Sequence, residues 1–195
     1  MYYLAVIRKQ SLKGAILSSC SDFSSFGFFQ KKSAREFMRF SSLMLVGRTE
    51  PETKISVREQ TYVCHAFVQS DRLAAAAVTD DEYPPNVAHI CLSQLLSDFE
   101  AYLPPRIWKR AEDSVEFPGI NAIFEKYSSP KNLDLVTTTQ GQIDETKIIL
   151  HQTLESILQR GEKLDELVNK ADDLSLQAKT FYKSARKSNN CCSGI

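Results

Sequence analysis

Apolar and small residues recur at alternating steps of three and four through the last third of the chain. A mean period of about 3.5 residues predicts a helix that buries a narrow seam against partner helices in a left-handed coiled coil. No proline interrupts this segment. The seam positions are Val136, Thr139, Ile143, Thr146, Leu150, Thr153, Ile157, Leu164, Leu167, Ala171, Leu174, Ala178, Phe181, Ala185 and Ser188.

Arg160 occupies the middle of this seam with a charged side chain. Burying its guanidinium is costly unless acceptors meet its five donors, and the neighbouring layers, Ile157 and Leu164, offer none. Two interpretations stay open on spacing alone. Either other polypeptides supply the acceptors and the polar layer fixes register, or Arg160 extends to the edge of an ordinary coiled coil. The many Thr and Ala layers favour several closely packed helices over a dimer.

The first 130 residues show shorter patterns of a different kind. The order of elements predicts an α+β domain in which helices sandwich an antiparallel sheet. Expected strands cover residues 2–7, 14–17, 54–58, 61–68 and 73–78, and expected helices cover residues 33–46, 86–103 and 119–127. Residues 106–118 are expected to be irregular. The turn-forming run at residues 128–132 predicts a boundary, which divides the chain into residues 1–130, 131–190 and 191–195.

The helix expected at residues 33–46 carries more apolar surface than one sheet requires. Ser33 and Glu36 form a predicted capping box, and Gly47 is the predicted stop. Phe37, Phe40 and Met44 belong to an apolar arc of roughly 160°, whereas a single core-facing side needs about 100°. The surplus indicates either a second partner for the helix or cover from the loop at residues 20–32. That loop holds four phenylalanines and is expected to pack onto the domain.

Composition and motifs argue against chemistry on substrates. The 24 basic and 24 acidic residues cancel, so nothing indicates nucleic-acid binding. Cys64 and His65 are adjacent on an expected strand, so their side chains point to opposite faces and cannot form a nucleophile–base pair. The acidic run at residues 80–82 precedes a helix and complements its dipole. With no phosphate-binding loop and no zinc-type spacing, we expect no enzyme activity, metal or cofactor.

The C-terminal five residues suggest covalent lipids. Cys192 lies four from the end, as in a prenylation box, and Cys191 beside it could be reversibly palmitoylated. Ser193 and Gly194 are not aliphatic and Ile195 is an unusual last residue, so farnesyl and geranylgeranyl both stay open. After Asp173 every charged residue is basic. This run indicates either attraction to an anionic membrane or stabilisation of the C-terminal end of a helix through its dipole. No run of apolar residues reaches the length of about 18 that a membrane-spanning helix needs. We therefore expect the protein to be made and kept on the cytosolic side.

Three stretches carry a specific resemblance. Residues 142–151 (QIDETKIILH), 157–168 (ILQRGEKLDELV) and 181–187 (FYKSARK) resemble the SNARE motif of the synaptobrevin-like R-SNAREs. The resemblance places Arg160 at the central ionic layer, where three glutamine-bearing SNARE helices would meet it in a four-helix bundle that draws membranes together. The preceding order of elements is similar to the longin domain, whose sheet is five-stranded and profilin-like. With Cys191 and Cys192, the chain resembles the doubly lipidated Ykt-type SNAREs.

The resemblance implies an R-SNARE that acts in vesicle fusion, including transport between the ER and the Golgi. It also implies that the protein cycles between the cytosol and the cytosolic face of endomembranes. An alternative is a lipidated longin regulator that occupies partner SNAREs without driving fusion. The resemblance also suggests a closed form, in which the seam or a lipid lies against a groove formed by Phe37, Phe40 and Met44. Whether that groove holds the helix, the lipid or both stays open.

Overall fold

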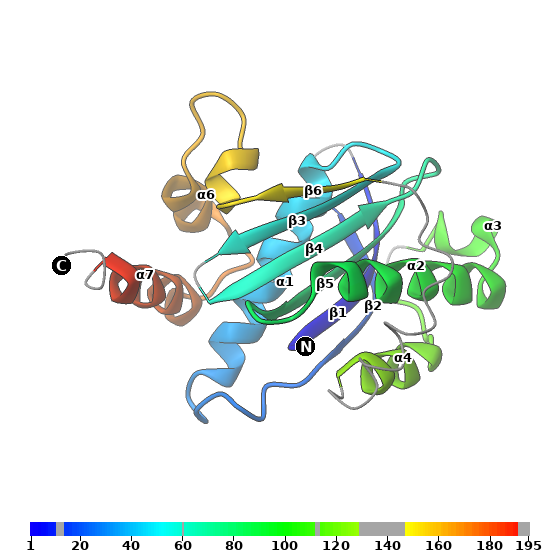
Figure 1. Ribbon diagram of the computed structural model, residues 1–195, viewed down its shortest axis with the longest axis horizontal. Coiled ribbons are helices and arrows are strands. Elements are labelled where there is room, and N and C mark those ends of the chain that lie inside the picture. The colour runs from blue at the N-terminus through cyan, green and yellow to red at the C-terminus, as the bar shows by residue number, and fades with distance from the viewer. Residues whose placement is uncertain (11–13, 60, 112–113, 129–146, 191–195) are drawn as a thin grey trace.

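The computed structural model describes residues 1–10, 14–59, 61–111, 114–128 and 147–190, with side chains described as far as Lys183 (Figure 1). A twisted sheet forms the middle layer, α1 (Lys31–Arg48) covers one face, and α2 (Pro85–Tyr102) covers the other together with α4 (Gly119–Ser128). The four-residue α3 (Pro105–Trp108) follows α2. This α+β arrangement is the expected one, although α3 lies in a stretch that was expected to be irregular.

The sheet has six strands in the order β2-β1-β5-β4-β3-β6. Their bounds are β1 Tyr3–Arg8, β2 Ala15–Ser21, β3 Thr53–Glu59, β4 Tyr62–Val68, β5 Leu73–Asp80 and β6 Ile148–His151. All neighbours pair antiparallel except β6, which runs parallel to β3. The first five strands agree with the sequence-based expectation within a few residues.

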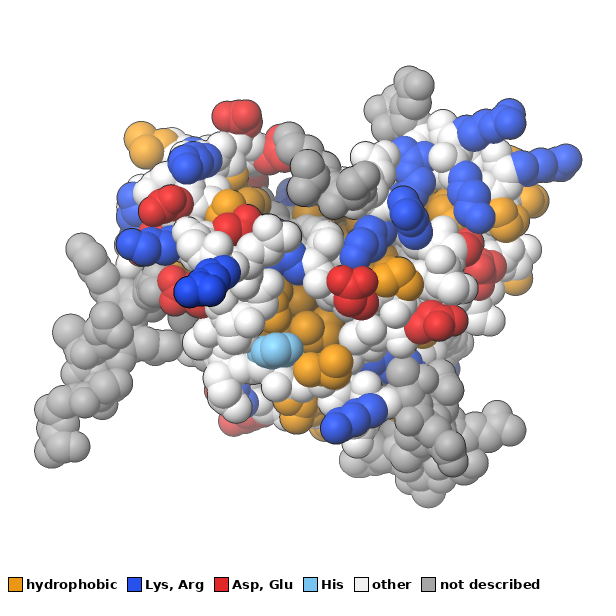
Figure 2. Space-filling view, turned by 90° about the horizontal axis from the view of Figure 1, so that it is seen from above, with side chains coloured by type: hydrophobic (Ala, Val, Ile, Leu, Met, Phe, Trp, Pro, Cys, Tyr) orange, Lys and Arg blue, Asp and Glu red, His pale blue; other side chains and the backbone are white. Residues whose placement is uncertain are grey.

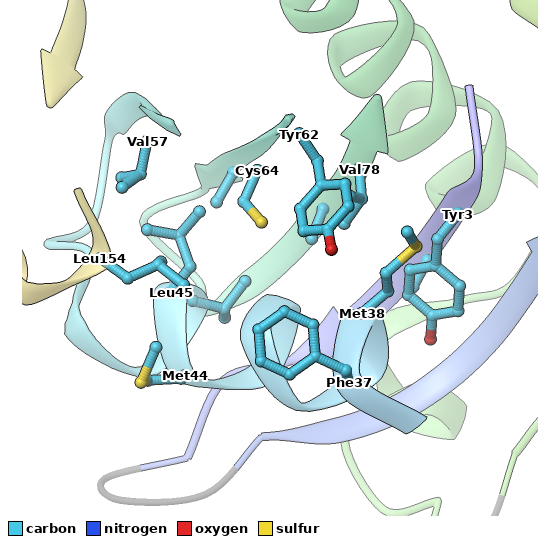
Figure 3. Close-up of a cluster of buried hydrophobic side chains, with 14 of the residues drawn as sticks. Tyr3, Phe37, Met38, Met44, Leu45, Val57, Tyr62, Cys64, Val78 and Leu154 are labelled. Carbon is cyan, nitrogen blue, oxygen red and sulfur yellow. The ribbon is translucent and has the colours of Figure 1, made fainter. Parts of the chain in front are cut away.

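Alternating side chains of the central strands build a core on each face of the sheet. Tyr3, Ala5 and Ile7 of β1 face α1, whereas Leu4 and Val6 face α2. The alanine run of β5 alternates in the same way, and its small side chains let helices pack closely on both faces. Figure 3 shows the α1-side core, which also includes Leu154 from the C-terminal part of the chain.

The C-terminal segment, residues 147–190, does not form one helix. After β6 it continues as a 3₁₀ turn, η1 (Leu154–Ile157), followed by α6 (Leu164–Lys170) and α7 (Leu176–Asn190). It lies along β3 and α1 (Figure 1). A lone helix with small seam residues gains little stability, whereas Ile148 and Ile149 are strand-forming residues that find an open edge at β3. The expected five-stranded sheet was therefore wrong by one strand.

The ends of α1 and the aromatic loop also differ from expectation. The helix starts at Lys31, so Ser33 lies inside its first turn and forms no cap, and Gly47 stays within the helix. Phe23 is buried, as expected, but Phe28 and Phe29 are 84% and 91% exposed. Two of the loop's four phenylalanines, Phe23 and Phe26, therefore pack on the α1-side core, whereas Phe28 and Phe29 do not.

Candidate functional site

The candidate site is the interface between α1 and the C-terminal segment. Phe37 lies at its centre, and its ring stacks on Tyr182 with 5.3 Å between ring centroids. The same ring lies 6.3 Å from Phe181 and 6.4 Å from Tyr62 of β4. Phe37 therefore joins the core of the N-terminal domain to α7, and this contact uses part of the surplus apolar arc.

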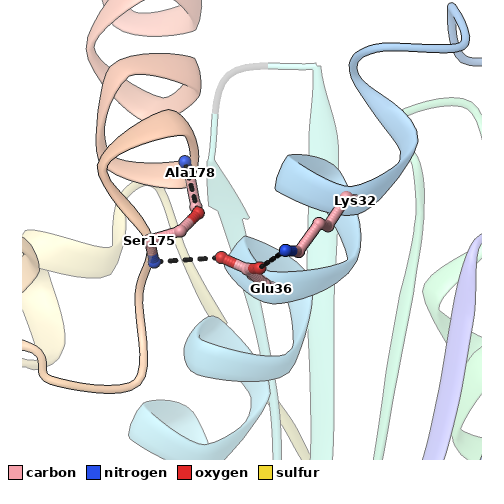
Figure 4. Close-up of polar contacts among 4 residues, drawn as sticks. All are labelled: Lys32, Glu36, Ser175 and Ala178. Atoms are coloured by element: carbon pink, nitrogen blue, oxygen red, sulfur yellow. Dashed lines mark hydrogen bonds and ion pairs between the residues drawn. The ribbon is translucent and has the colours of Figure 1, made fainter.

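A polar contact fixes the start of α7 beside α1 (Figure 4). The backbone N–H of Ser175 donates to Glu36 Oε2 at 3.0 Å, and Lys32 Nζ lies 4.0 Å from Glu36 Oε1. The Ser175 hydroxyl accepts the Ala178 N–H at 3.2 Å, which is an N-terminal helix cap. Burial opposes ionisation of Glu36, but the hydrogen bonds from Ser175 outweigh it and lower the pKa of the carboxyl group. Glu36 thus serves the interface instead of capping its own helix.

A tight turn displays Arg160 next to the other end of α1. The Glu162 N–H donates to the Gln159 carbonyl at 3.0 Å, and Gly161 has φ +92°. A glycine with positive φ is suited to the third position of a type II turn. Arg160 is exposed at the second position. Arg48 Nη2 donates to Glu162 Oε2 at 2.9 Å, which ties this turn to α1.

A groove of about 400 Å³ lies between α1 and α6. Phe40 and Met44 line it from α1, and Leu167 and Ala171 face them from the C-terminal segment. Its volume is within the range of about 300–1,000 Å³ that is common for small-molecule sites. Of the three expected groove residues, Phe40 and Met44 line this space, whereas Phe37 lies in the aromatic contact with α7.

Seam positions do not share one environment. Leu164, Leu174 and Ala178 are buried, Ile157, Leu167, Ala171 and Phe181 are partly buried against the α1-side core, and Leu150 and Thr153 are exposed. Figure 2 shows the face over β6, where hydrophobic side chains gather between charged ones. Val136, Thr139, Ile143, Thr146, Cys191 and Cys192 lie outside the described residues, as do the side chains of Ala185 and Ser188.

Three fully buried residues of the C-terminal segment were missed because they lie one position past the seam. Leu154, Val168 and Tyr182 each have no exposed surface. In the sequence, Val168 and Tyr182 each directly follow an apolar seam residue, and such an adjacent apolar pair indicates a second buried face. A search for a single 3.5-residue repeat counts only the first residue of each pair. The interface with α1 and β3 therefore uses a set of residues that overlaps only partly with the seam.

Away from this interface, Cys64, His65 and His89 are buried in the core of the domain. Burial raises the pKa of the Cys64 thiol to about 12. His65 lies on the opposite face of β4 from Cys64, and its Nδ1 is 2.8 Å from Ser56 Oγ. Among the described residues, no three potential metal ligands come together. No helix of the described elements has the length and apolar composition needed to cross a bilayer.

Comparison with known proteins identifies relatives along the whole chain. The Synaptobrevin family model matches residues 136–192, and the Regulated-SNARE-like (longin) domain matches residues 23–124. A Schizosaccharomyces pombe protein called Synaptobrevin homolog ykt6 is 39% identical, with 98% of each chain covered. Proteins called Synaptobrevin homolog YKT6 from Eremothecium gossypii and Saccharomyces cerevisiae are 37% and 36% identical, again with 98% of each chain covered.

Proposed function

The chain belongs to the synaptobrevin-like R-SNAREs that carry a longin domain, and we propose that it alternates between the closed form described above and an open, lipid-anchored form that drives fusion. Members of this family act in vesicle fusion, bind other SNARE helices and are not enzymes. The proposed units are a longin domain at residues 1–130, an R-SNARE motif at residues 131–190 and a lipidation tail at residues 191–195. The contact of Phe181 and Tyr182 with Phe37 carries the proposal of a closed form.

In the open form, residues 136–188 become one helix of a four-helix bundle. Arg160 then forms the central ionic layer with one glutamine from each of three partner helices. The exposure of Arg160 in the closed form supports this role, because no acceptor among the described residues has to be abandoned when the helix forms. The turn at Gly161 must become helical during this change, and glycine adopts both backbone conformations easily.

In the closed form, the interface withdraws part of the seam from partners. Leu164, Leu174 and Ala178 are buried against the domain and cannot contact a partner helix until they are released. The groove between α1 and α6 leaves space for a hydrocarbon chain beside Phe40 and Met44. We therefore include both the SNARE segment and a prenyl chain in the closed form.

Covalent lipids anchor the open form to the cytosolic face of endomembranes. We assign prenylation to Cys192 and reversible palmitoylation to Cys191. One lipid chain gives marginal, exchanging attachment, whereas two hold stably, so removing the palmitoyl group returns the protein to the cytosol. No cofactor beyond these covalent groups is proposed.

Reconstituted fusion tests this function. Vesicles carrying the lipidated protein are mixed with vesicles carrying three glutamine-bearing SNARE helices, and lipid mixing is followed by fluorescence. The parent is expected to fuse the vesicles. Arg160→Leu is expected to assemble with equal or higher thermal stability but with mispairing or resistance to disassembly, because it removes a desolvation cost and a register device.

Two results contradict the proposal in different ways. Complete loss of assembly in Arg160→Leu would contradict the buried ionic layer. Tight binding of all three partners by the lipidated parent without lipid mixing would instead identify a regulator that occupies SNAREs.

A further inference from the structure

The three most exposed large hydrophobic side chains of the described residues come from two separate segments. Phe29, Phe28 and Leu176 are 91%, 84% and 77% exposed. The two phenylalanines lie in the loop between β2 and α1, and Leu176 begins α7. Adjacent exposed apolar side chains of this size are typical of surfaces that contact another protein or a membrane.

The loop presents its two phenylalanines from a fixed base. Phe23 is buried and packs edge-on against Phe26, with 5.7 Å between ring centroids. The Phe26 N–H donates to the Phe23 carbonyl at 3.1 Å, and the Gln30 N–H donates to the Gly27 carbonyl at 2.8 Å. The next two rings, Phe28 and Phe29, contact each other edge-on at 5.4 Å and point into solvent. The aromatic pair is thus a fixed protrusion.

The contact drawn in Figure 4 brings the start of α7, where Leu176 lies, beside the first turns of α1. Ser175, the neighbour of Leu176, is hydrogen-bonded to Glu36, and Glu36 is one helical turn from Lys32. Lys32 in turn follows Phe29 by a single turn of chain at the start of α1. The three apolar side chains therefore all lie toward the N-terminal half of α1.

Positive charge accompanies these apolar groups. Lys31 and Lys32 begin α1, and the Lys32 side chain is 85% exposed. Lys183 is exposed on α7, two turns after Leu176. The acidic group between the segments, Glu36, is already engaged by Ser175 and Lys32. On the Leu176 side, Asp172 and Asp173 are exposed, so the positive charge of this surface belongs to the loop side, at Lys31 and Lys32.

We propose that Phe28, Phe29 and Leu176, flanked by Lys31 and Lys32, form a membrane-contact surface that docks the closed form on anionic phospholipid bilayers. Aromatic and aliphatic side chains enter the interface between headgroups and acyl chains, and adjacent lysines are attracted to anionic lipids. The occupant is a bilayer because the apolar groups protrude, and a deformable lipid surface accepts a protrusion without a matching pocket. The position of Leu176 depends on the closed arrangement proposed above, but the contact needs no covalent lipid.

The test uses the full chain without lipid modification and phosphatidylcholine vesicles with or without phosphatidylserine. The parent is expected to bind vesicles that contain phosphatidylserine. Phe28→Ser with Phe29→Ser should weaken this binding at least about tenfold, because the buried area of even one such side chain accounts for that factor. Lys31→Gln with Lys32→Gln should remove most of the preference for phosphatidylserine and flatten the salt dependence. Ile107→Ser, which is 45% exposed on α3, is the matched control and should bind like the parent.

Fluorescence locates the contact directly. The only tryptophan, Trp108, is fully buried, so Phe29→Trp adds one exposed reporter. Brominated lipids should quench this reporter and leave Ile107→Trp unquenched. Absence of binding by the parent, equal binding by the loop variant, or quenching of Ile107→Trp alone would overturn the proposal. Self-association that the loop variant abolishes, without vesicle binding by the parent, would assign the surface to a second copy instead. None of these results depends on fusion activity or lipidation.

Discussion

Arg48 Nη2 lies 2.9 Å from Glu162 Oε2, and the same carboxylate oxygen accepts the Gln159 N–H at 3.0 Å. The last turn of α1 therefore holds both sides of the turn that displays Arg160. The hydrogen bond from Arg48, followed by the one from Gln159, lowers the pKa of Glu162. Arg160, the residue proposed for the ionic layer, is thus presented by contacts that would have to break in the proposed bundle.

Reversing the charge of Arg48 should loosen the closed form. Arg48→Glu replaces an attraction by a repulsion, and a partly exposed pair of this kind is worth up to about 1 kcal/mol. Hydrogen exchange across residues 148–170 should therefore rise about fivefold. Combining Arg48→Glu with Glu162→Arg should restore most of the protection. If the double variant exchanged as fast as the single one, this pair would not hold the segment.

Gly161→Ala should shift the chain toward the helical, open form. Alanine is strained at φ +92°, and it favours a helix over glycine by about 1 kcal/mol. No atom lies within 4 Å of the added Cβ, so the effect is conformational. Assembly with partner helices should become about tenfold faster in stopped-flow fluorescence. Gly47→Ala is the control, because it is already helical with equally free space. Unchanged assembly in Gly161→Ala would show that this turn does not limit opening.

Val168→Ser with Tyr182→Ser should open the closed form and spare the bundle. Both side chains are fully buried against the domain, and each truncation costs about 2 kcal/mol or more. Neither residue occupies a seam position, so the melting temperature of the assembled bundle should be nearly unchanged. Leu174→Ser, at a buried seam position, is the contrast and should lower both stabilities. The argument fails if the off-seam pair destabilises the bundle as much as Leu174→Ser does.

The domain should lose stability at mildly acidic pH. Ser56 Oγ lies 2.8 Å from both His65 Nδ1 and His89 Nε2, and His65 Nε2 lies 3.1 Å from Thr79 Oγ1. Burial, with the neighbouring His89, lowers the pKa of His65 to about 3, and burial, with the charge of Lys54, lowers that of His89 to about 3. The unfolded chain therefore binds more protons. Stability is complete above about pH 6.5 and falls as the pH decreases toward 3, by up to about 1.4 kcal/mol per pH unit for each histidine.

Denaturant unfolding between pH 7 and 5 measures this slope. His89→Gln should reduce it by about half, because His65 then remains as the buried histidine of the pair. A flat profile for the parent would mean that neither buried histidine is held neutral in the folded state.

The two terminal cysteines should differ in their effect on membrane attachment. Cys192→Ser is expected to release the protein from membranes completely, whereas Cys191→Ser should leave weak, exchanging attachment through a single chain. Cell fractionation compares the two, and intact-mass analysis of the C-terminal peptide identifies the prenyl group. Equal fractionation would mean that the two roles are misassigned.

The domain was largely predictable because its strands and helices are specified locally. The strand β3 and the helix α2 are each recognisable from the periodicity of their own apolar residues. The apolar face predicted for α2 is the one that packs on the sheet. The ends of α1 were not predictable in the same way. The expected capping box gave Glu36 a local partner, Ser33, whereas in the structure Glu36 accepts a hydrogen bond from Ser175, which is 139 residues away.

The conformation of the C-terminal segment illustrates a different limit. The 3.5-residue repeat of the seam predicts packing against helices of partner chains. It does not predict which residues of the same chain the segment contacts when those partners are absent. The isoleucines of β6 could be recognised as strand-forming, but their pairing with β3 depends on an edge that only the folded domain creates. The exposed position of Arg160 follows from the same long-range contacts.

The parallel pairing of β6 with β3 has a further consequence for the opened protein. In the closed form, backbone groups from Lys54 to Val57 are paired with residues 148–151, and β6 covers that edge of the domain's own five strands. In the proposed open form β6 leaves to join a bundle, and β3 would become an unpaired edge strand, which is a template for aggregation with other chains. If the proposed opening occurs, the SNARE segment also protects the domain from misassembly, and any condition that holds the chain open without partners would expose the edge of β3.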